Sequence, residues 1–319
     1  MKFDLNCKIS IGVTLLFFIL LPVVYFAKNK QYHKELFQFI ADNNFSQGDY
    51  FESSKYYRKL IAMGAGNETV YTNMAISMVK LGYYDRGIEY LKKVLRNANT
   101  SQIYYSIGYA YFQKARTINS IPVFNKALGY INESIILDKQ SIDGYRMMGQ
   151  IFERMKKFDR ARIWYNKALS VIPDKREFYN LIAYTYMQQN DLDNAAVFYK
   201  KGTENNDKNL QAYCALGEIY RQKADFNIAV EYYKKAIDTD SGYITPYYKI
   251  GQIYYDAKDY EQALLWYGRA LLIDNNNNIV NYCIGKVYKD QGMKDKAVSY
   301  FKTAAYCGND DAIKELREI

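Results

Sequence analysis

The sequence predicts an all-α protein, in which one apolar membrane segment precedes a long array of repeated helix pairs. Three observations favour this fold class. A run of 19 uncharged residues lies near the N-terminus, small and bulky side chains recur about every 34 residues over most of the chain, and the last ten residues form an amphipathic pattern. Stacked helix pairs that contact only their neighbours build an α-solenoid. We therefore expect one anchor and one solenoid rather than two globular domains.

The membrane segment is predicted over residues 9–27, between Lys8 and Lys28, after a short N-terminal tail of residues 1–8. A helix of this length spans about 28 Å, close to the roughly 30 Å of bilayer hydrocarbon. The alternative is a cleaved signal peptide, whose apolar region is usually about 7 to 15 residues long and ends at a small-x-small site. Bulky Tyr25 stands two residues before Ala27. An uncleaved transmembrane helix is therefore favoured.

The orientation of this segment is less strongly indicated by the flanking charges. Lys2 and Lys8 precede it, and Lys28, Lys30 and Lys34 follow it. Because the positive-inside rule compares the basic residues on the two sides, it discriminates little here. We expect a single-pass membrane protein with the N-terminus inside, the bulk of the chain outside the cytoplasm, and a juxtamembrane linker over residues 28–34.

Small residues mark eight repeats between residues 35 and 309. A first column of small side chains holds Ala41, Ala75, Gly108, Gly149, Ala183, Gly217, Gly251 and Gly285, separated by 34, 33, 41, 34, 34, 34 and 34 residues. A second small column holds Ser53, Gly87, Ala127, Ala161, Ala195, Ala229, Ala263 and Ala297, and a bulky column four residues later holds Tyr57, Leu91, Ile131, Tyr165, Tyr199, Tyr233, Tyr267 and Phe301. Spacings of 3, 4 and 7 within each stretch are helical. Each repeat should therefore be an antiparallel helix pair.

Helix packing explains why these columns hold these residue types. Where two helix axes come close, a small side chain leaves room for the facing ridge, and the large side chain beside it fills the groove. Most tyrosines, of which there are 35 in the chain, fall in such packing columns. We expect replacement of Ala195 or Gly217 by leucine to cost about 1 to 3 kcal/mol through overpacking.

On these columns the chain resembles the tetratricopeptide repeat family, whose unit is a helix-turn-helix of 34 residues. The resemblance covers residues 35–309 and implies a right-handed α-solenoid that binds a protein or peptide partner on the concave face lined by the first helix of each pair. The chain departs from the family pattern in two respects. The proline often found near the end of the unit occurs only as Pro173, and the first two repeats are the weakest copies.

Candidate binding residues are the aromatic and polar side chains that flank the packing columns on the first helices. Rigid aromatic groups with polar tips suit a peptide groove, because they bury area at a small entropy cost. The lysine and asparagine pairing with which chaperone-binding members hold a C-terminal carboxylate is absent. The candidates are Tyr105, Tyr109, Phe112, Arg146, Gln150, Glu153, Asn180, Tyr184, Glu218, Arg221, Tyr248, Gln252, Tyr255 and Tyr282.

No catalytic, metal or cofactor site is expected. The chain has one histidine, His33, four cysteines without a CxxC pair, and no GxxxxGK[ST], GxGxxG or HExxH motif. These motifs carry phosphate binding, dinucleotide binding and zinc chemistry respectively. The chain has a net charge of +9 but no recognisable nucleic-acid-binding module, so its charge is only weak support for a nucleic-acid partner. We therefore expect neither an enzyme, nor a nucleic-acid partner, nor a small-molecule substrate.

Two further features leave alternatives open. About seven extra residues, around positions 116–123, interrupt the repeat pattern and fit either a protruding contact or a tolerated loop insertion, the second being slightly favoured. Residues 28–173 carry an excess of ten basic residues, whereas residues 174–319 have an excess of two acidic ones. The densest basic cluster fits a solvated helix face better than a site for anionic lipid or an acidic partner, and comprises Arg154, Lys156, Lys157, Arg160, Arg162 and Lys167.

Residues 310–319 form the final element. Apolar residues lie on one side of this segment and charges elsewhere, as in the amphipathic helix that covers the last apolar face of a solenoid. The whole pattern predicts a membrane-tethered scaffold for protein–protein interaction. A cell-envelope assembly factor and an organelle import-receptor-like adaptor are the alternatives, although the zinc-binding cysteines of lipopolysaccharide-assembly members are not matched by Cys283 and Cys307.

Overall fold

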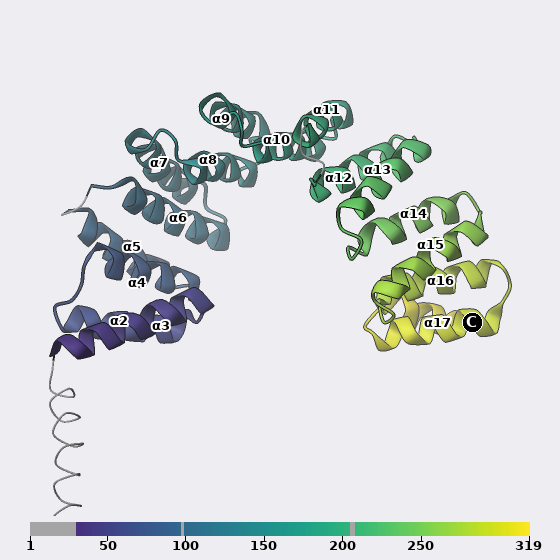
Figure 1. The fold of residues 1–319 in the computed structure, drawn as a ribbon, viewed down its shortest axis with the longest axis horizontal. Coiled ribbons are helices and arrows are strands. Elements are labelled where there is room, and N and C mark those ends of the chain that lie inside the picture. Colours follow the sequence, from purple (N-terminus) through teal and green to yellow (C-terminus); the bar gives the residue numbers. More distant parts are fainter. Residues whose placement is uncertain (1–29, 97–98, 205–207) are drawn as a thin grey trace, which may run out of the picture. The chain divides into compact units, whose positions relative to one another are not determined.

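The computed structural model describes residues 30–96, 99–204 and 208–319, and every regular element in these ranges is an α-helix. The helices form two compact units that divide between Trp164 and Tyr165, inside α9 (Phe158–Val171). The first unit contains α2 (Lys30–Gln47), α3 (Tyr50–Ala62), α4 (Glu68–Lys80), α5 (Tyr84–Leu95), α6 (Ser101–Ile118), α7 (Ile121–Leu137) and α8 (Ile142–Arg154). The second contains α10 (Glu177–Gln188), α11 (Leu192–Thr203), α12 (Leu210–Gln222), α13 (Phe226–Thr239), α14 (Thr245–Asp256), α15 (Tyr260–Ile273), α16 (Asn278–Asp290), α17 (Lys294–Tyr306) and α18 (Asp310–Glu318) (Figure 1).

The predicted membrane segment, residues 9–27, lies outside the described residues. Within the described ranges, none of the helices combines the length and the apolar character needed to cross a bilayer. Residues 30–34, which were expected to be linker, belong to α2.

Within each unit, consecutive helices pack side by side along the chain. All members of the two small columns and of the bulky column are buried, which confirms the packing role predicted for them. The close approach is tightest at the glycines. A Cβ atom on Gly217 would lie 2.6 Å from Cε1 of Tyr233, and one on Gly251 would lie 2.5 Å from Cε1 of Tyr267. The first helix of a pair therefore contacts the bulky side chain of the second directly.

Aromatic pairs join the two helices of a repeat at a second level. The rings of Tyr220 and Tyr232 stack with centroids 5.5 Å apart, and the rings of Tyr186 and Phe198 stack at the same distance. Stacked rings of this kind add to the stabilisation that comes from area burial. Interhelix packing thus accounts for much of the aromatic content of the chain, as expected.

A residue with positive φ ends the first helix of every pair. These residues are Gly48, Gly82, Asn119, Lys156, Asn190, Ala224, Lys258 and Gly292. The left-handed conformation reverses the chain within two or three residues and gives the last carbonyl groups of the helix a donor, as at Asp225 N, which bonds to Tyr220 O at 2.9 Å. The turn geometry therefore recurs although its residue type does not.

The extra residues of the third pair lengthen both of its helices. α6 has 18 residues and α7 has 17, whereas α10 and α11 have 12 each. Asn119 ends α6 with φ of 48°, and Pro122 stands in the first turn of α7. The insertion therefore extends a helical hairpin rather than forming an open loop.

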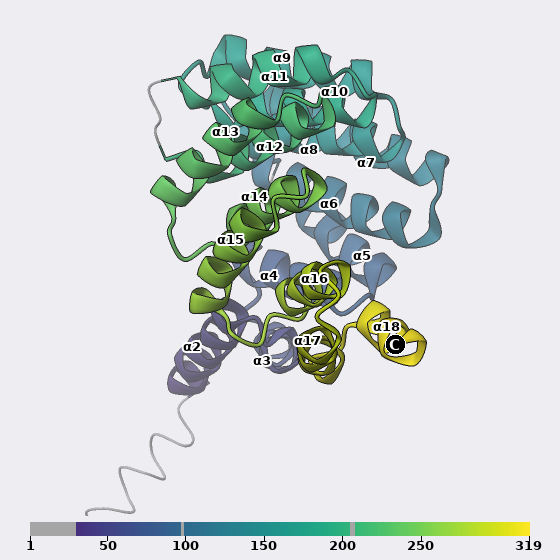
Figure 2. The same ribbon diagram turned by 90° about the vertical axis from the view of Figure 1, so that its right-hand side faces the viewer.

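At the C-terminus, α18 lies beside α17 (Figure 2). Ala312 of α18 is fully buried with Ala297, Phe301 and Ala304 of α17, and Leu316 packs against the same cluster. The charged side of α18 faces away from this cluster, so the helix covers the apolar surface of the last repeat.

Candidate functional site

The candidate residues form three columns on the first helices, one residue per repeat. The first column holds Tyr105, Arg146, Asn180, Tyr248 and Tyr282, the second holds Tyr109, Gln150, Tyr184, Glu218 and Gln252, and the third holds Phe112, Glu153, Arg221 and Tyr255. Within the third to eighth repeats the same spacing adds four positions that sequence reasoning missed, namely Cys214, Lys286, Met187 and Lys289. Each of them lies 34 residues from a candidate in a neighbouring repeat, so the repeat interval identifies them.

In the second unit, polar contacts cross from each first helix to the next. Lys249 of α14 lies 3.6 Å from Glu218 of α12, and the Tyr255 hydroxyl of α14 donates a hydrogen bond of 2.6 Å to Asp290 of α16. Lys289 of α16 pairs with Glu315 of α18. These contacts connect α12, α14, α16 and α18 into one polar surface.

Glu218 is the most highly coordinated carboxylate of this surface. Arg221 donates two hydrogen bonds to it, of 2.6 and 3.2 Å, Gln222 donates one of 3.1 Å, and the Tyr233 hydroxyl donates one of 3.2 Å. Burial alone would raise the pKa of Glu218, but these donors and the nearby Lys249 ammonium lower it to about 2. Glu218 and Arg221 are therefore held in place by each other, and act as a preorganised pair rather than as two free charges.

Aromatic side chains flank this charged pair. Tyr184 is 44% exposed, whereas Tyr248, Tyr255 and Tyr282 are half-buried. The Lys286 ammonium lies 5.0 Å from the centre of the Tyr255 ring, and the Tyr282 ring packs 5.8 Å from Phe301. Burial and the hydrogen bond to Asp290 raise the pKa of Tyr255, so its hydroxyl stays a donor. These tyrosine rings are therefore partly exposed while neighbouring side chains hold them in place.

Cys214 occupies the same surface and is half-buried. Burial raises the pKa of its thiol to about 11, which leaves the thiol protonated and unreactive at neutral pH. Among the described residues there is also no group of three or more His, Cys, Asp or Glu side chains able to hold a metal ion.

The first unit carries a corresponding surface on α4, α6 and α8, and α6 contacts both of the other helices. The Lys80 ammonium lies 5.5 Å from the centre of the Tyr109 ring. Burial, followed by the charge of Asp143, raises the pKa of Tyr105 to about 12. Arg146 forms an ion pair with Asp143, one turn away on α8, and Gln150 and Glu153 are partly exposed beside it.

Phe112 is the exception among the candidates. It is only 5% exposed, because its ring packs against Phe124 of α7, with centroids 6.1 Å apart. The prediction that Phe112 is available to a partner is wrong. Phe124 belongs to the second helix of the pair, so the spacing within the first helix alone does not reveal that it covers Phe112.

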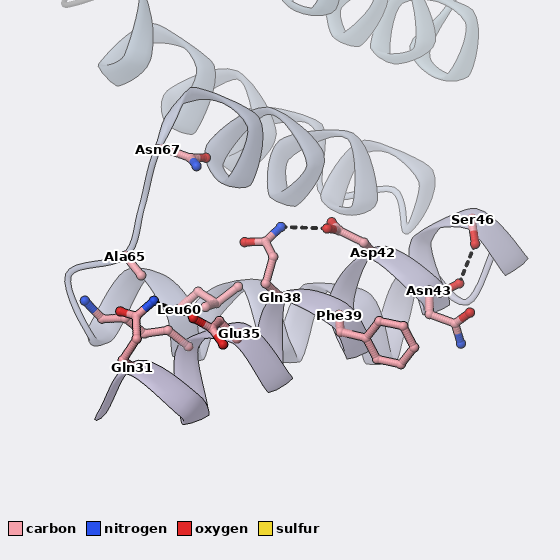
Figure 3. A pocket seen from close by; sticks show the side chains of 11 residues that line it. Gln31, Glu35, Gln38, Phe39, Asp42, Asn43, Ser46, Leu60, Ala65 and Asn67 are labelled. Carbon is pink, nitrogen blue, oxygen red and sulfur yellow. Dashed lines mark hydrogen bonds between the residues drawn. The ribbon is translucent and has the colours of Figure 1, made fainter. Parts of the chain in front are cut away.

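A pocket of about 690 Å³ opens beside α2, at the start of the array (Figure 3). Gln38 donates a hydrogen bond of 2.8 Å to Asp42, and Ser46 bonds to the backbone carbonyl of Asn43. Phe39 is 70% exposed at its edge, and Leu60, Ala65 and Asn67 complete the lining. We call the surface formed by the three columns of candidate residues the first-helix surface. The pocket extends this surface into the first repeat, where the sequence pattern is weakest.

Comparisons with known proteins agree with the repeat pattern. The sequence profile described as tetratricopeptide repeat matches residues 101–133, 142–175, 177–209, 210–243 and 280–306, and a second profile described as TPR repeat matches residues 251–292. The chain therefore belongs to the tetratricopeptide repeat family. The comparison with curated proteins found no significant match.

Solved structures with tetratricopeptide-like folds are similar to this chain. A tetratricopeptide repeat protein from Parabacteroides merdae is 14% identical, with a TM-score of 0.53, over 80% of this chain and 98% of that one. The pilF protein of Pseudomonas aeruginosa is 16% identical, with a TM-score of 0.52, over 69% and 97%. MamA is 26% identical over 52% and 96%, with a TM-score of 0.47. At these levels of identity the first two likenesses concern the fold alone.

Proposed function

We propose that this tetratricopeptide repeat protein is a membrane-tethered scaffold that binds a segment of a partner protein along the first-helix surface. The observation that carries the proposal is the polar and aromatic surface from α12 to α18, where Tyr248 and Tyr255 stand among charged groups fixed by their own hydrogen bonds. Preorganised charges and rigid rings reduce the entropy lost on binding. In this proposal the repeats hold the binding side chains in position, and no chemical reaction is involved.

The mode of binding follows from the types of side chain. Half-buried tyrosines offer apolar area with a hydroxyl at the edge, which suits an extended or helical segment that places an apolar side chain every few residues. The ion pairs that connect neighbouring helices set the positions where polar side chains of the partner find a complement. Affinity is expected to come from a few aromatic positions, and specificity from the charges between them.

The tether is proposed from the apolar residues 9–27 and places the repeats near a membrane, with the bulk of the chain outside the cytoplasm. Confinement to a surface raises the effective concentration of partners that share that membrane. Extraction of membranes with alkaline carbonate should leave the chain in the pellet, and external protease should digest residues 30–319 in intact cells. Release into the supernatant, or full protection from protease, would contradict this part of the proposal.

The partner surface is tested by substitution after in-cell photocrosslinking has identified a bound protein segment. Tyr184→Ala and Tyr248→Ala are expected to weaken binding of that segment by about 5- to 30-fold each, because truncation of a hot-spot aromatic costs on the order of 1 to 2 kcal/mol. The matched control is Tyr306→Ala on α17, where the ring is 94% exposed on a second helix. Equal affinity in all three variants, measured by titration calorimetry, would disprove the surface.

A further inference from the structure

The lengthened third helix pair creates a second pocket, beyond the candidate residues of the first helices. The pocket measures about 440 Å³ and lies where the extension of α6 meets the start of α7, the start of α5 and the end of α8. It shares no residue with the candidate surface described above, and all its residues belong to the first unit. The lining residues are Tyr84, Gln113, Arg116, Thr117, Asn119, Phe124 and Arg154.

Two arginines from different helices line this pocket without a carboxylate partner. Arg116 comes from the extension of α6 and Arg154 from the last turn of α8, and within the described ranges neither takes part in an ion pair. The neighbouring cation Lys114 differs, because it pairs with Asp85 at 2.6 Å. The pocket therefore concentrates positive charge that the protein itself leaves unneutralised.

The remaining lining residues hold this arrangement in place. The Arg116 guanidinium bonds to the Gln113 side chain at 3.1 Å and lies 5.7 Å from the centre of the Phe112 ring. The Tyr84 and Thr117 hydroxyls are 2.9 Å apart, and Phe124 is buried behind them. Guanidinium groups present parallel N–H donors that match the oxygens of a carboxylate or a phosphoryl group. The Thr117 hydroxyl donates to the Gln113 carbonyl at 3.1 Å and accepts from Tyr84, so these two groups fix the lining while the guanidinium groups supply the donors for a ligand.

An apolar surface adjoins the charged pocket. Ile118, the last residue of α6, and Ile121, the first residue of α7, are both more than half exposed at the tip of the extended hairpin. Asn119, which lines the pocket, lies between these two isoleucines in the sequence, so we expect the residue that follows a bound acidic side chain to contact them. The tip thus combines an anion-binding pocket with a neighbouring apolar contact.

We propose that this pocket binds an anionic side chain, carboxylate or phosphoryl, of a partner protein, with an apolar neighbour resting on Ile118 and Ile121. Two arginines that line one pocket from two helices can both contribute donors to a single anionic group. A bilayer surface is flat and would contact protruding cations instead, such as those on the exposed face of α9. The seven-residue insertion is then a protruding contact rather than a tolerated loop.

The test uses the full chain and a peptide array with randomised flanks around a central pair of residues. The second residue of the pair is leucine, and the first is Asp, Glu, phosphoserine, phosphotyrosine, serine or lysine. We expect signal for the four anionic residues and little for serine or lysine. Arg116→Gln and Arg154→Gln should each reduce it, and the double variant should lose about tenfold or more in affinity. A variant with lysine at both positions should recover only part of this affinity, because lysine restores the positive charge but not the paired N–H donors of the guanidinium group.

Arg58→Gln on α3 is the matched control, since Arg58 is also exposed in the first unit and lies outside the pocket. It should bind the array like the unchanged protein. Absence of a preference for anionic peptides, or equal binding by the double variant, would overturn the proposal. So would a double variant that loses binding only to phosphatidylcholine vesicles containing phosphatidylglycerol. Unchanged binding of the array by Tyr184→Ala would separate this pocket from the first-helix surface.

Discussion

At the scale of single residues, the side chain that a glycine lacks decides how closely two helices approach. Gly217 and Gly268 are both helical glycines of the second unit, but their surroundings differ. A Cβ on Gly217 would meet the buried Tyr233 ring, whereas nothing lies within 4 Å of the Cβ position at Gly268. The sequence pattern distinguishes them as well, since only Gly217 belongs to a small column.

The two glycines should respond in opposite directions to alanine. Gly217→Ala is expected to lower the free energy of unfolding by about 1 to 3 kcal/mol, because the Tyr233 ring must shift from a well-packed position. Gly268→Ala should raise it by about 0.5 to 1 kcal/mol, because alanine favours the helix. Urea unfolding followed by circular dichroism measures both. Stabilisation by Gly217→Ala would show that the helices separate freely.

Glu218 adds a dependence on pH. Its pKa falls from 4.5 to about 2 on folding, so its contribution is complete above about pH 4.5 and is lost as the pH falls towards 2. Glu218→Gln should therefore cost about 1 to 3 kcal/mol at pH 6 and clearly less at pH 3. Urea titrations at constant ionic strength measure the difference. Glu231→Gln, at an exposed position of α13, should have little effect at either pH, and an equal cost of Glu218→Gln at both would contradict the mechanism.

At the scale of elements, the helix pairs differ in the residue that closes their turn. Gly292 adopts positive φ without steric cost. Ala224 and Lys258 adopt the same region at φ of 60°, where the Cβ atom comes too close to the backbone and raises the conformational energy. The packed faces on both sides hold the turn in this conformation. Local strain in some repeats is thus tolerated because the repeat geometry as a whole demands the same reversal everywhere.

Replacement of the strained residue should relieve this cost. Ala224→Gly is expected to stabilise the protein by about 0.5 to 1 kcal/mol, since glycine adopts the left-handed region freely. The reverse change, Gly292→Ala, should destabilise it by a similar or larger amount. Thermal denaturation of the two variants provides the comparison. A destabilised Ala224→Gly variant would mean that the turn changes conformation once the side chain is removed.

At the scale of the molecule, the contacts are local along the chain, since each helix packs mainly on its neighbours in sequence. Proteins built in this way derive their stability from individual repeats and from the interfaces between adjacent ones. A defect in one repeat should therefore spread over a limited distance. The two compact units are consistent with such short-range cooperativity.

Hydrogen exchange can measure this distance. In the Gly217→Ala variant, amide exchange should become faster in α11 to α14, because α12 and its neighbours lose part of their packing, while α4 to α7 keep the rates of the parent protein. Exchange followed by mass spectrometry resolves these segments. The Gly268→Ala variant serves as the control. Uniform acceleration in both units would show that the whole chain unfolds as one cooperative block instead.

The sequence by itself determined the helical repeats, because a face that is buried in every repeat must carry small and bulky residues at a fixed interval. It therefore located the buried columns, the family, and most residues of the first-helix surface. Tertiary structure decided which of these residues remain available. Phe112 is covered by Phe124, Glu218 and Arg221 bond to each other, and Arg116 lines one pocket with Arg154 because the insertion lengthens α6. Such contacts join residues of different helices, and a periodic pattern records the face on which a residue lies but not the side chain that meets it.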